Sequence, residues 1–217
     1  SEILVRAGVG KVTIVDRDYV DWSNMQRQQL YTEEDAARSI PKAHAAAQKL
    51  RAINSEIEIV AHTMDVTPEE IHDLTEGVDL IMDATDNFDI RMILNDISQK
   101  KAIPWIYGAC VGSYGLSYMV LPGKTPCLSC LLESVPMGGA TCDTVGVIAP
   151  VVQMVVATQT AEAIKWLSGN EEALSGKLTS FDLWNNQYTS IRVDQVKKED
   201  CPSCGNEREY PYLSASA

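Results

Sequence analysis

Positive charge and long apolar runs are both scarce in this sequence of 217 residues. No apolar run approaches the ~18 residues that a membrane-spanning helix needs, which argues against an integral membrane protein. Lys and Arg number 18 against 30 Asp and Glu, giving a net charge of −12. A general nucleic-acid-binding protein needs a basic face, so this balance argues against that class. The six cysteines are too few for a disulfide scaffold.

The remaining composition is typical of a soluble globular domain. Hydrophobic residues make up 45% and charged residues 22%, which disfavours disorder and fibrous repeats. The first ten residues, SEILVRAGVG, lack the basic start, apolar core and cleavage site of a signal peptide. We therefore expect a soluble, acidic domain that works in the cytoplasm.

Strand and helix patterns alternate along the first half of the chain. Alternating or β-branched segments predict strands over 11–18, 56–64, 78–86 and 103–110, and helical patterns fall between them over 40–54, 67–77 and 88–101. This alternation predicts an α/β fold with a mostly parallel, doubly wound sheet. Later segments predict antiparallel strands, including a hairpin with a two-residue loop at Asn185-Asn186. They also predict a helix over 148–169 that is apolar nearly all round and therefore buried.

The chain shows no convincing linker, so we expect a single domain over 1–217 with a mixed sheet. A doubly wound domain usually opens with a strand and a Gly-rich turn. This chain opens with the helical pattern LVRAG instead. We therefore expect the first strand and the Gly-rich loop to be missing, and the domain to be incomplete at its N-terminal side.

Polar residues after the first predicted strand suit a nucleotide. Asp16 lies where an acid commonly accepts ribose hydroxyls, although an aspartate there can also be a plain cap, and an NAD enzyme would show the same acid. Arg27 offers a planar fork and Lys42 a mobile charge, the pair that phosphate binding favours. The sequence therefore predicts a phosphate site here without choosing between ATP and a dinucleotide.

A second group of polar residues ends the strand over 78–86. Strand carboxyl ends face the ligand crevice in open α/β sheets, and a carboxylate there can hold Mg²⁺ beside phosphates. Asp86 and Asn87 occupy this place. One of them can also cap the helix that begins at Phe88, and the two roles are compatible.

Four cysteines form two Cys-x-x-Cys pairs, the grouping of a closed tetrahedral zinc site. The alternative is a redox role, which needs only one such pair. We predict a structural Zn²⁺ that joins the C-terminal tail to the sheet. Its ligands are Cys127, Cys130, Cys201 and Cys204.

The other two cysteines give weaker signals. Cys110 sits in Gly-Ala-Cys-Val-Gly, which superficially matches a nucleophile elbow, but a strand is predicted after it rather than a helix. We interpret Cys110 as a small buried hydrophobic residue. Cys142 lies in a loop with two glycines, and a plain loop thiol is one reading of it.

The order of these segments resembles one family. DRDYVDWSNMQRQQL, then PK, then DATDN, then the two Cys-x-x-Cys pairs look like the ThiF/MoeB/HesA adenylating enzymes, bacterial relatives of ubiquitin-activating enzymes. The resemblance implies a Rossmann-like fold, ATP and Mg²⁺. It also implies adenylation of the C-terminal glycine of a ubiquitin-like sulfur carrier of the ThiS or MoaD type, in thiamine or molybdopterin biosynthesis, with release of pyrophosphate. The family's G-x-G-x-x-G turn and N-terminal arginine have no counterpart here.

The resemblance also assigns roles to residues. Asp16 resembles the ribose ligand, Lys42 the lysine that contacts phosphate, and Asp86-Asn87 the acidic element near metal and triphosphate. In relatives that complete sulfur transfer, a cysteine placed like Cys142 can link to the carrier. The phosphate-side loop corresponds to Ser23, Asn24, Met25, Gln26 and Arg27.

These assignments lead to an adenylyltransferase in which Arg27, Lys42 and Asp86 do the chemistry. The attacking carboxylate is already a nucleophile, so positioning and charge neutralisation suffice. We expect a partner with a Gly-Gly tail and a homodimer. Two alternatives remain open: an NAD-dependent oxidoreductase, and a non-catalytic, zinc-stabilised binding module.

Overall fold

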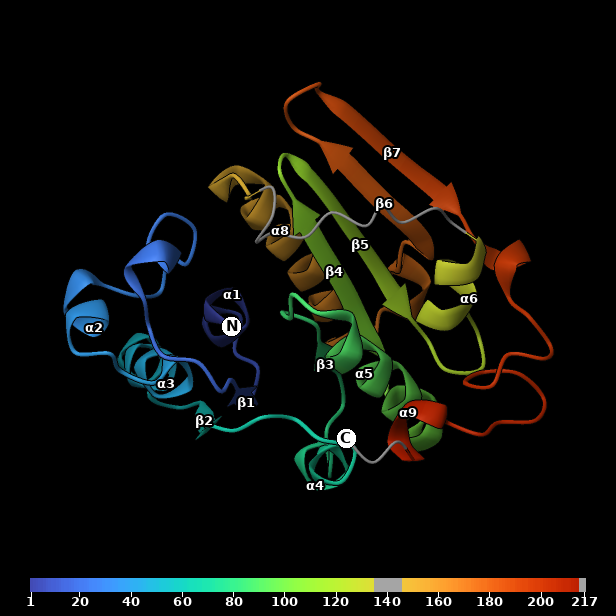
Figure 1. The fold of residues 1–217 in the computed structure, drawn as a ribbon, viewed down its shortest axis with the longest axis horizontal. Coiled ribbons are helices and arrows are strands. Elements are labelled where there is room, and N and C mark those ends of the chain that lie inside the picture. Colours follow the sequence, from blue (N-terminus) through green and yellow to red (C-terminus); the bar gives the residue numbers. More distant parts are fainter. Residues whose placement is uncertain (135–145, 215–217) are drawn as a thin grey trace. The chain divides into compact units, whose positions relative to one another are not determined.

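The structure is a computed structural model that describes residues 1–134 and 146–214 (Figure 1). Contacts along the chain divide it into two compact units, Ser1–Val66 and Thr67–Ala217. Within the described residues, no helix is both long and apolar enough to cross a membrane.

The first unit pairs two parallel strands and packs helices against them. Strand β1 (Lys11–Val15) pairs in parallel with β2 (Glu58–His62), in a register that joins Lys11 to Glu58 and Val15 to His62. The helices are α1 (Glu2–Arg6), α2 (Glu33–Ala37) and α3 (Lys42–Ile53), with a 3₁₀ turn η1 (Trp22–Asn24). The core contains Val5, Ala47, Leu50, Ile57 and Ile59, so α1 and α3 bury their apolar positions together.

Helix α2 was not predicted, although its start has a recognisable pattern. Thr32 is the N-cap, and its side chain accepts a hydrogen bond from the backbone N–H of Asp35. The Asp35 carboxylate accepts in return from the Thr32 backbone N–H at 2.7 Å. This reciprocal capping box satisfies two donors that the first turn leaves unpaired.

We predict that Asp35→Asn lowers stability in a pH-dependent way. Burial acts to raise the pKa of Asp35, but hydrogen bonds from Lys49 and Thr32 outweigh it and leave the pKa below its ordinary value. Because the pKa is lower in the folded state, the ionised carboxylate stabilises the fold above about pH 4 and ceases to do so as the pH falls further. The substitution should cost about 1–3 kcal/mol of unfolding free energy at pH 7.

Urea unfolding at pH 7 and at pH 3.5 checks this prediction. The difference between wild type and Asp35→Asn should shrink at the lower pH, because the unfolded wild-type chain then binds a proton at this carboxylate more readily than the folded protein does. Glu33→Gln, which removes an exposed acid from the same helix, serves as the control. A difference that stays constant between the two pH values would contradict the assignment to Asp35.

The second unit contains a five-stranded mixed sheet in the order β3-β4-β5-β6-β7 (Figure 1). Strand β3 (Ile81–Met82) runs parallel to β4 (Trp105–Val111), and the remaining neighbours pair antiparallel. The other strands are β5 (Tyr114–Val120), β6 (Lys177–Asp182) and β7 (Gln187–Arg192). The described helices are α4 (Glu70–Leu74), α5 (Phe88–Lys101), α6 (Leu128–Ser134), α8 (Ala149–Leu167) and α9 (Pro211–Ser214), with 3₁₀ turns η2 (Glu171–Ala173) and η3 (Asp194–Val196).

The fold class predicted from the sequence is confirmed. The structure is α/β. Strand β1 pairs in parallel with β2, β3 pairs in parallel with β4, and the pairing from β4 onward is antiparallel. Hydrogen bonds divide the described strands between two sheets, where a single mixed sheet was expected. The division of the chain into one domain over 1–217 stays a prediction.

Two local predictions need correction. The hairpin around Asn185-Asn186 exists, but its loop has four residues because Asp182 pairs with Gln187. The Asp182 carboxylate accepts hydrogen bonds from the backbone of Trp184 and Asn185, which stabilises this longer turn. Of the two asparagines, only Asn186 has a positive φ, of 53°.

Helix α8 was expected to be buried all round, and it is not. Val151, Val155, Gln159 and Ala163 recur at the spacing of one helical face and are buried. This face lies against β4 and β5, behind the sheet in the view of Figure 1. On other sides of the helix, Ile164 and Leu167 are 40% and 39% exposed.

Candidate functional site

The four paired cysteines meet in one cluster. Their sulfur atoms all lie within 4.8 Å of one another. The Cys127 Sγ is 3.6 Å from that of Cys201 and 3.9 Å from that of Cys130, and the Cys130 Sγ is 3.6 Å from that of Cys204. A tetrahedral ion with Zn–S bonds of ~2.3 Å requires sulfur–sulfur separations of about 3.8 Å. All four side chains are buried, so the cluster fits a closed structural metal site.

Local structure brings the two pairs together. Cys127 immediately precedes α6 and Cys130 lies in its first turn, whereas Cys201 and Cys204 lie in the tail after η3. Gly205 closes the second turn, because its N–H donates to the Cys201 carbonyl at 2.8 Å. A Cβ at Gly205 would lie 2.4 Å from the Glu199 carbonyl oxygen, so a larger residue would displace this turn.

Contacts within the cluster shift the pKa values of two thiols in opposite directions. Hydrogen bonds from Cys127 and Cys204 lower the pKa of Cys130 to about 2. The hydrogen bonds that Cys127 makes with Cys130 and Cys204 raise the pKa of Cys127, and burial raises it further. Helix α5 supports the first pair, since Asn95 accepts from the Leu128 N–H and donates to Ser129.

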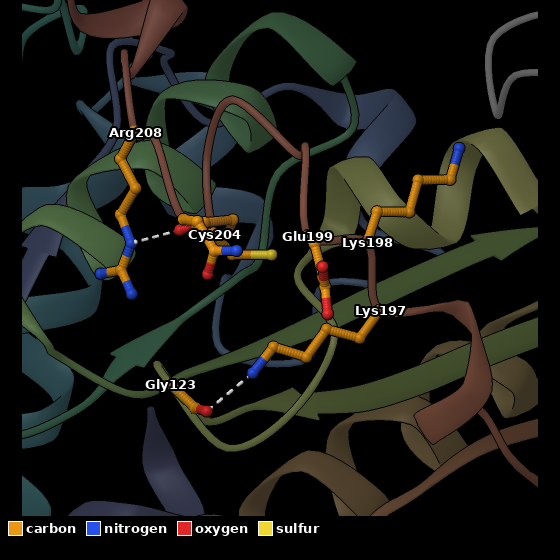
Figure 2. A pocket seen from close by; sticks show the side chains of 8 residues that line it. Gly123, Lys197, Lys198, Glu199, Cys204 and Arg208 are labelled. Atoms are coloured by element: carbon orange, nitrogen blue, oxygen red, sulfur yellow. Dashed lines mark hydrogen bonds between the residues drawn. The ribbon is translucent and has the colours of Figure 1, made fainter.

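A pocket of about 420 Å³ lies beside Cys204 (Figure 2). The basic side chains that line the pocket form hydrogen bonds or an ion pair with other residues of this chain. The Lys197 ammonium donates to the Gly123 carbonyl at 2.7 Å, the Arg208 Nε donates to the Gly205 carbonyl at 3.0 Å, and Lys198 pairs with Glu133. These contacts hold the tail around the cysteine cluster, and they give no sign of a ligand site.

In the first unit, the predicted residues Asp16 and Lys42 are joined through Asp18 at the carboxyl end of β1. Asp16 follows the strand directly, and its carboxylate accepts from the Asp18 N–H at 2.9 Å. Lys42 begins α3 and is buried, and its ammonium lies 3.0 Å from the Asp18 carboxylate. The Lys42 N–H also donates to the Asp18 carbonyl. The start of α3 is thereby fixed beside the strand end that carries Asp16.

The loop over 21–28 adds polar groups from the same unit. Asp21 caps η1 by accepting from the Ser23 N–H at 2.8 Å, and hydrogen bonds from Ser23 lower the pKa of Asp21. Arg27 donates to the Ser23 carbonyl at 3.1 Å. Two side-chain amide oxygens in this loop, Asn24 Oδ1 and Gln28 Oε1, are buried and have no hydrogen-bond partner within the described residues. Two such amides in the loop that carries Arg27 fit a polar ligand with both acceptor and donor groups.

The remaining members of this loop differ from one another. Met25 packs its side chain against the cluster of Val20, Ala36 and Ala45. Gln26 is exposed. Met25 therefore also holds the loop against the core of the first unit.

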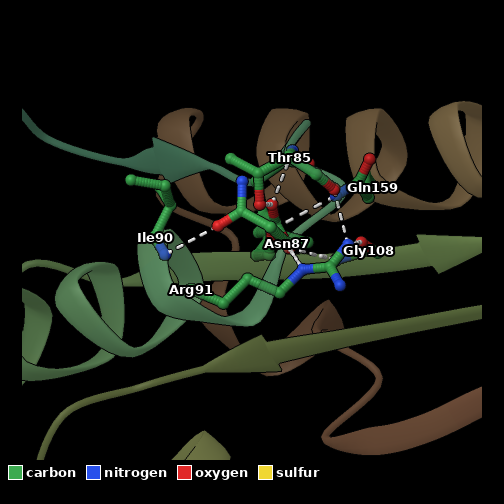
Figure 3. A network of polar contacts seen from close by, with 8 residues as sticks. Thr85, Asn87, Ile90, Arg91, Gly108 and Gln159 are labelled. Carbon is green, nitrogen blue, oxygen red and sulfur yellow. Dashed lines mark hydrogen bonds and ion pairs between the residues drawn. The ribbon is translucent and has the colours of Figure 1, made fainter. Parts of the chain in front are cut away.

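Asp86 and Asn87 belong to the second unit, in the loop between β3 and α5. Asn87 caps α5, because its Oδ1 accepts from the Ile90 N–H at 3.0 Å (Figure 3). This confirms that one of the two polar residues is a helix cap. Asp86 is exposed beside it.

Sequence reasoning missed the buried pair behind this loop. Asp83 and Arg91 are 2% and 5% exposed, and their side chains form an ion pair of 3.0 Å. Burial raises the pKa of Asp83, while the charge of Arg91 and hydrogen bonds from Thr85 and Gly108 favour the ionised form. The available signal was an aspartate at the end of an apolar strand, eight residues before an arginine on the following helix.

Cys142 lies outside the described residues. Cys110 is half-buried in β4 and is followed by β5, so the strand–turn–helix of a nucleophile elbow is absent at this position. The strand predicted around Cys110 is confirmed, but its side chain is half-buried and not buried as expected.

A model of the ThiF family matches residues 1–203. The sulfur carrier protein ThiS adenylyltransferase of Bacillus subtilis is 53% identical over 214 residues, which cover 99% of this chain and 63% of that protein. The Escherichia coli protein of the same description is 35% identical, with 96% of this chain and 81% of that protein covered. The Escherichia coli molybdopterin-synthase adenylyltransferase is 32% identical, with 94% and 81% covered.

Solved structures of the same fold are also found. A crystal structure described as Escherichia coli MccB with ATP matches with a TM-score of 0.78 and 23% identity, over 94% of this chain and 61% of that one. MccB in complex with N-formylated MccA matches with a TM-score of 0.80 and 22% identity, over 94% and 62%. At this identity the similarity establishes the fold alone.

Proposed function

The chain belongs to the ThiF family, and from that premise we propose that it takes part in the ATP-dependent adenylation of the C-terminal glycine of a ubiquitin-like sulfur carrier. The main support is the position of Asp16 and Lys42 at one strand end, with the loop of Arg27 in the same unit, in a family whose relatives are described as adenylyltransferases. The chain spans only 63% of the Bacillus subtilis relative. A carrier of the ThiS type is favoured because the relatives of 53% and 35% identity are both described as ThiS adenylyltransferases.

The proposed reaction needs no nucleophile from the enzyme. A carboxylate oxygen of the carrier's C-terminal glycine attacks the α-phosphorus of ATP, a new P–O bond forms, and the bond to the β-phosphate breaks to release pyrophosphate. Asp16 would accept ribose hydroxyls, and Asn24 and Gln28 would hydrogen-bond the nucleotide. Arg27 and Lys42 would neutralise phosphate charge, and Asp86 would hold Mg²⁺, which lowers the repulsion between the phosphates when bound.

Mass spectrometry of a ThiS-type carrier tests this function. After incubation with the full chain, ATP and Mg²⁺, the intact carrier should gain the mass of one adenylate. A carrier that lacks its last glycine is the control and should gain nothing. An unmodified carrier under conditions in which ATP protects the protein from thermal unfolding would contradict the proposal.

An NAD-dependent oxidoreductase is the competing function on the same fold. A ligand stabilises the folded state that binds it, so melting curves with ATP-Mg²⁺ and with NAD separate the two. We expect Tm to rise when ATP-Mg²⁺ is added and to stay unchanged when NAD is added. A rise with NAD alone would favour the oxidoreductase.

We further propose Zn²⁺ at the cysteine cluster, a homodimer and a location in the cytoplasm. The separations of the four sulfur atoms support the ion. The exposed apolar residues Ile164 and Leu167 on α8 support a partner surface. No cysteine in the described part of the chain forms a disulfide, which supports a reducing compartment.

We predict that Arg27→Ala and Lys42→Met raise KM for ATP and lower kcat together. Each change removes a cation that would contact phosphate in both the ground state and the transition state. Methionine keeps the buried aliphatic stem of Lys42, so the start of α3 should stay packed. The measurement is the steady-state rate at which labelled pyrophosphate exchanges into ATP. The control is Arg38→Ala, which changes a surface arginine of the same unit. Unchanged KM in both variants would remove these residues from the nucleotide site.

We predict that Cys142→Ala leaves pyrophosphate exchange intact. Adenylation uses the carboxylate of the carrier as its nucleophile, so a thiol has no part in this step. A later sulfur-transfer step could still depend on the thiol. Exchange of labelled pyrophosphate into ATP is the measurement. Loss of exchange in a folded Cys142→Ala protein would contradict the separation of the two steps.

A further inference from the structure

The buried pair of Asp83 and Arg91 lies directly behind the loop that carries Asp86. Asp83 Oδ1 accepts from both the N–H and the hydroxyl of Thr85, each at 2.8 Å. The Arg91 Nη2 donates to the Thr85 carbonyl at 2.5 Å. Both polar groups of the Thr85 backbone are therefore fixed by the pair (Figure 3).

The pair is itself anchored to the sheet and to α8. Asp83 Oδ2 accepts from the Gly108 N–H, and Arg91 Nη2 donates to the Gly108 carbonyl at 3.0 Å. Gln159 of α8 donates to the carbonyls of Asp83 and Ile106 at 2.9 and 3.2 Å. A Cβ at position 108 would lie 2.4 Å from Gln159 Nε2, so glycine is the residue that admits this contact.

This arrangement places Asp86 between two fixed neighbours. Thr85 is bonded to the pair on one side, and Asn87 is fixed on the other side by capping α5. Asp86 has an exposed side chain on a backbone held at both ends. Arg91 is 5% exposed, and its Nε and Nη2 donate to Asp83, Thr85 and Gly108, so these contacts lie in the interior of the unit.

We propose that Asp83, Arg91 and Gln159 are positioning residues that preorganise the Asp86 loop for the adenylation step. The proposal rests on the proposed function, since it concerns the reaction that Asp86 would serve. A carboxylate that holds a metal in the transition state must be fixed before the reaction, or its ordering lowers the rate. The planar fork of Arg91 matters here, because it bridges three acceptors that a lysine ammonium cannot reach with the same geometry.

The central test compares Arg91→Lys with Ser98→Ala in the full chain. Arg91→Lys keeps the charge but loses the fork, and we expect kcat for exchange to fall about tenfold or more while KM for ATP changes less than about threefold. Ser98 lies near the other end of α5, is buried, and donates to the Ile103 carbonyl, so its loss should lower Tm without lowering kcat. A folded Arg91→Lys protein with normal kcat would overturn the proposal.

Coupling to Asp86 separates positioning from general stability. If Arg91 acts through Asp86, adding Asp86→Ala to Arg91→Lys should lower kcat by less than the same change does in the wild type. If the fold-losses in kcat of the two single variants simply multiply in the double variant, the residues act independently. That result would overturn the proposal even if kcat falls in each single variant.

Amide hydrogen exchange gives a readout that does not need catalysis. Peptides over 84–87 should exchange faster in Arg91→Lys and Gln159→Leu than in the wild type, and should be unchanged in Ser98→Ala. Equal exchange in all four proteins would overturn the proposal. If the wild type itself shows no pyrophosphate exchange, the proposed function fails, and the hydrogen-exchange result alone then decides whether the pair orders the loop.

Discussion

Asp86→Ala is expected to lower carrier-dependent pyrophosphate exchange by ~10²-fold or more, the range seen when one preorganised electrostatic group is deleted. As proposed, the carboxylate serves the transition state, where negative charge moves toward the departing pyrophosphate. The side chain is exposed in a loop, and Asn87 rather than Asp86 caps α5. Stability should therefore barely change.

Exchange kinetics and melting curves together decide this prediction. Asp89→Ala is the matched control, because it removes another exposed acid from the first turn of α5. Its exchange rate should stay near that of the wild type. Near-normal exchange in Asp86→Ala would remove the residue from the reaction, and a large fall in Tm would indicate a structural role instead.

Cys201→Ser is expected to abolish stable metal binding and to destabilise the second unit by several kcal/mol. The sulfur atoms of all four cysteines lie within 4.8 Å of one another, and two of these cysteines belong to the tail after η3. A bound ion contributes its binding free energy to the folded state alone, so loss of one ligand removes much of that contribution. We expect a fall in Tm of roughly 10 °C or more.

Elemental analysis with thermal unfolding tests the metal. Wild-type protein purified without chelators should contain one zinc per chain, and Cys110→Ala should keep it because Cys110 lies in β4, outside the cluster. Wild-type protein without zinc would contradict the proposed ion. Loss of catalysis in Cys201→Ser without loss of stability would contradict a structural role for it.

Several features of the fold could be predicted because they follow from local patterns. The strands over β1, β2, β4 and β5 have apolar or alternating sequences, and Gly8 ends α1 with a φ of 86°. The meeting of two distant Cys-x-x-Cys pairs was also predictable, because four thiolates in this grouping suit one ion.

Other features depend on contacts that no local pattern reveals. Helix α8 is apolar over most of its length, yet which face is buried is decided by its packing on β4 and β5. The hairpin loop has four residues because Asp182 bonds the turn. Strand β3 has two residues where nine were expected, although the Asp83 N–H still donates to the Ile106 carbonyl beyond it.

The candidate site was predicted unevenly for the same reason. Asp16, Arg27 and Lys42 follow the end of a strand, which is a position that sequence can identify. Arg91 and Gln159 lie on two different helices and are connected through Asp83 and Gly108. Their connection to the Asp86 loop is a tertiary property.

Exchange of labelled pyrophosphate into ATP by the full chain tests the central claim most directly. With Mg²⁺ and a ThiS-type carrier bearing a C-terminal Gly-Gly, the label should appear in ATP, and it should not appear when the carrier is omitted or its last glycine removed. No exchange in folded, zinc-loaded protein, or exchange that is independent of the carrier's last glycine, would contradict the claim that this chain adenylates a sulfur carrier.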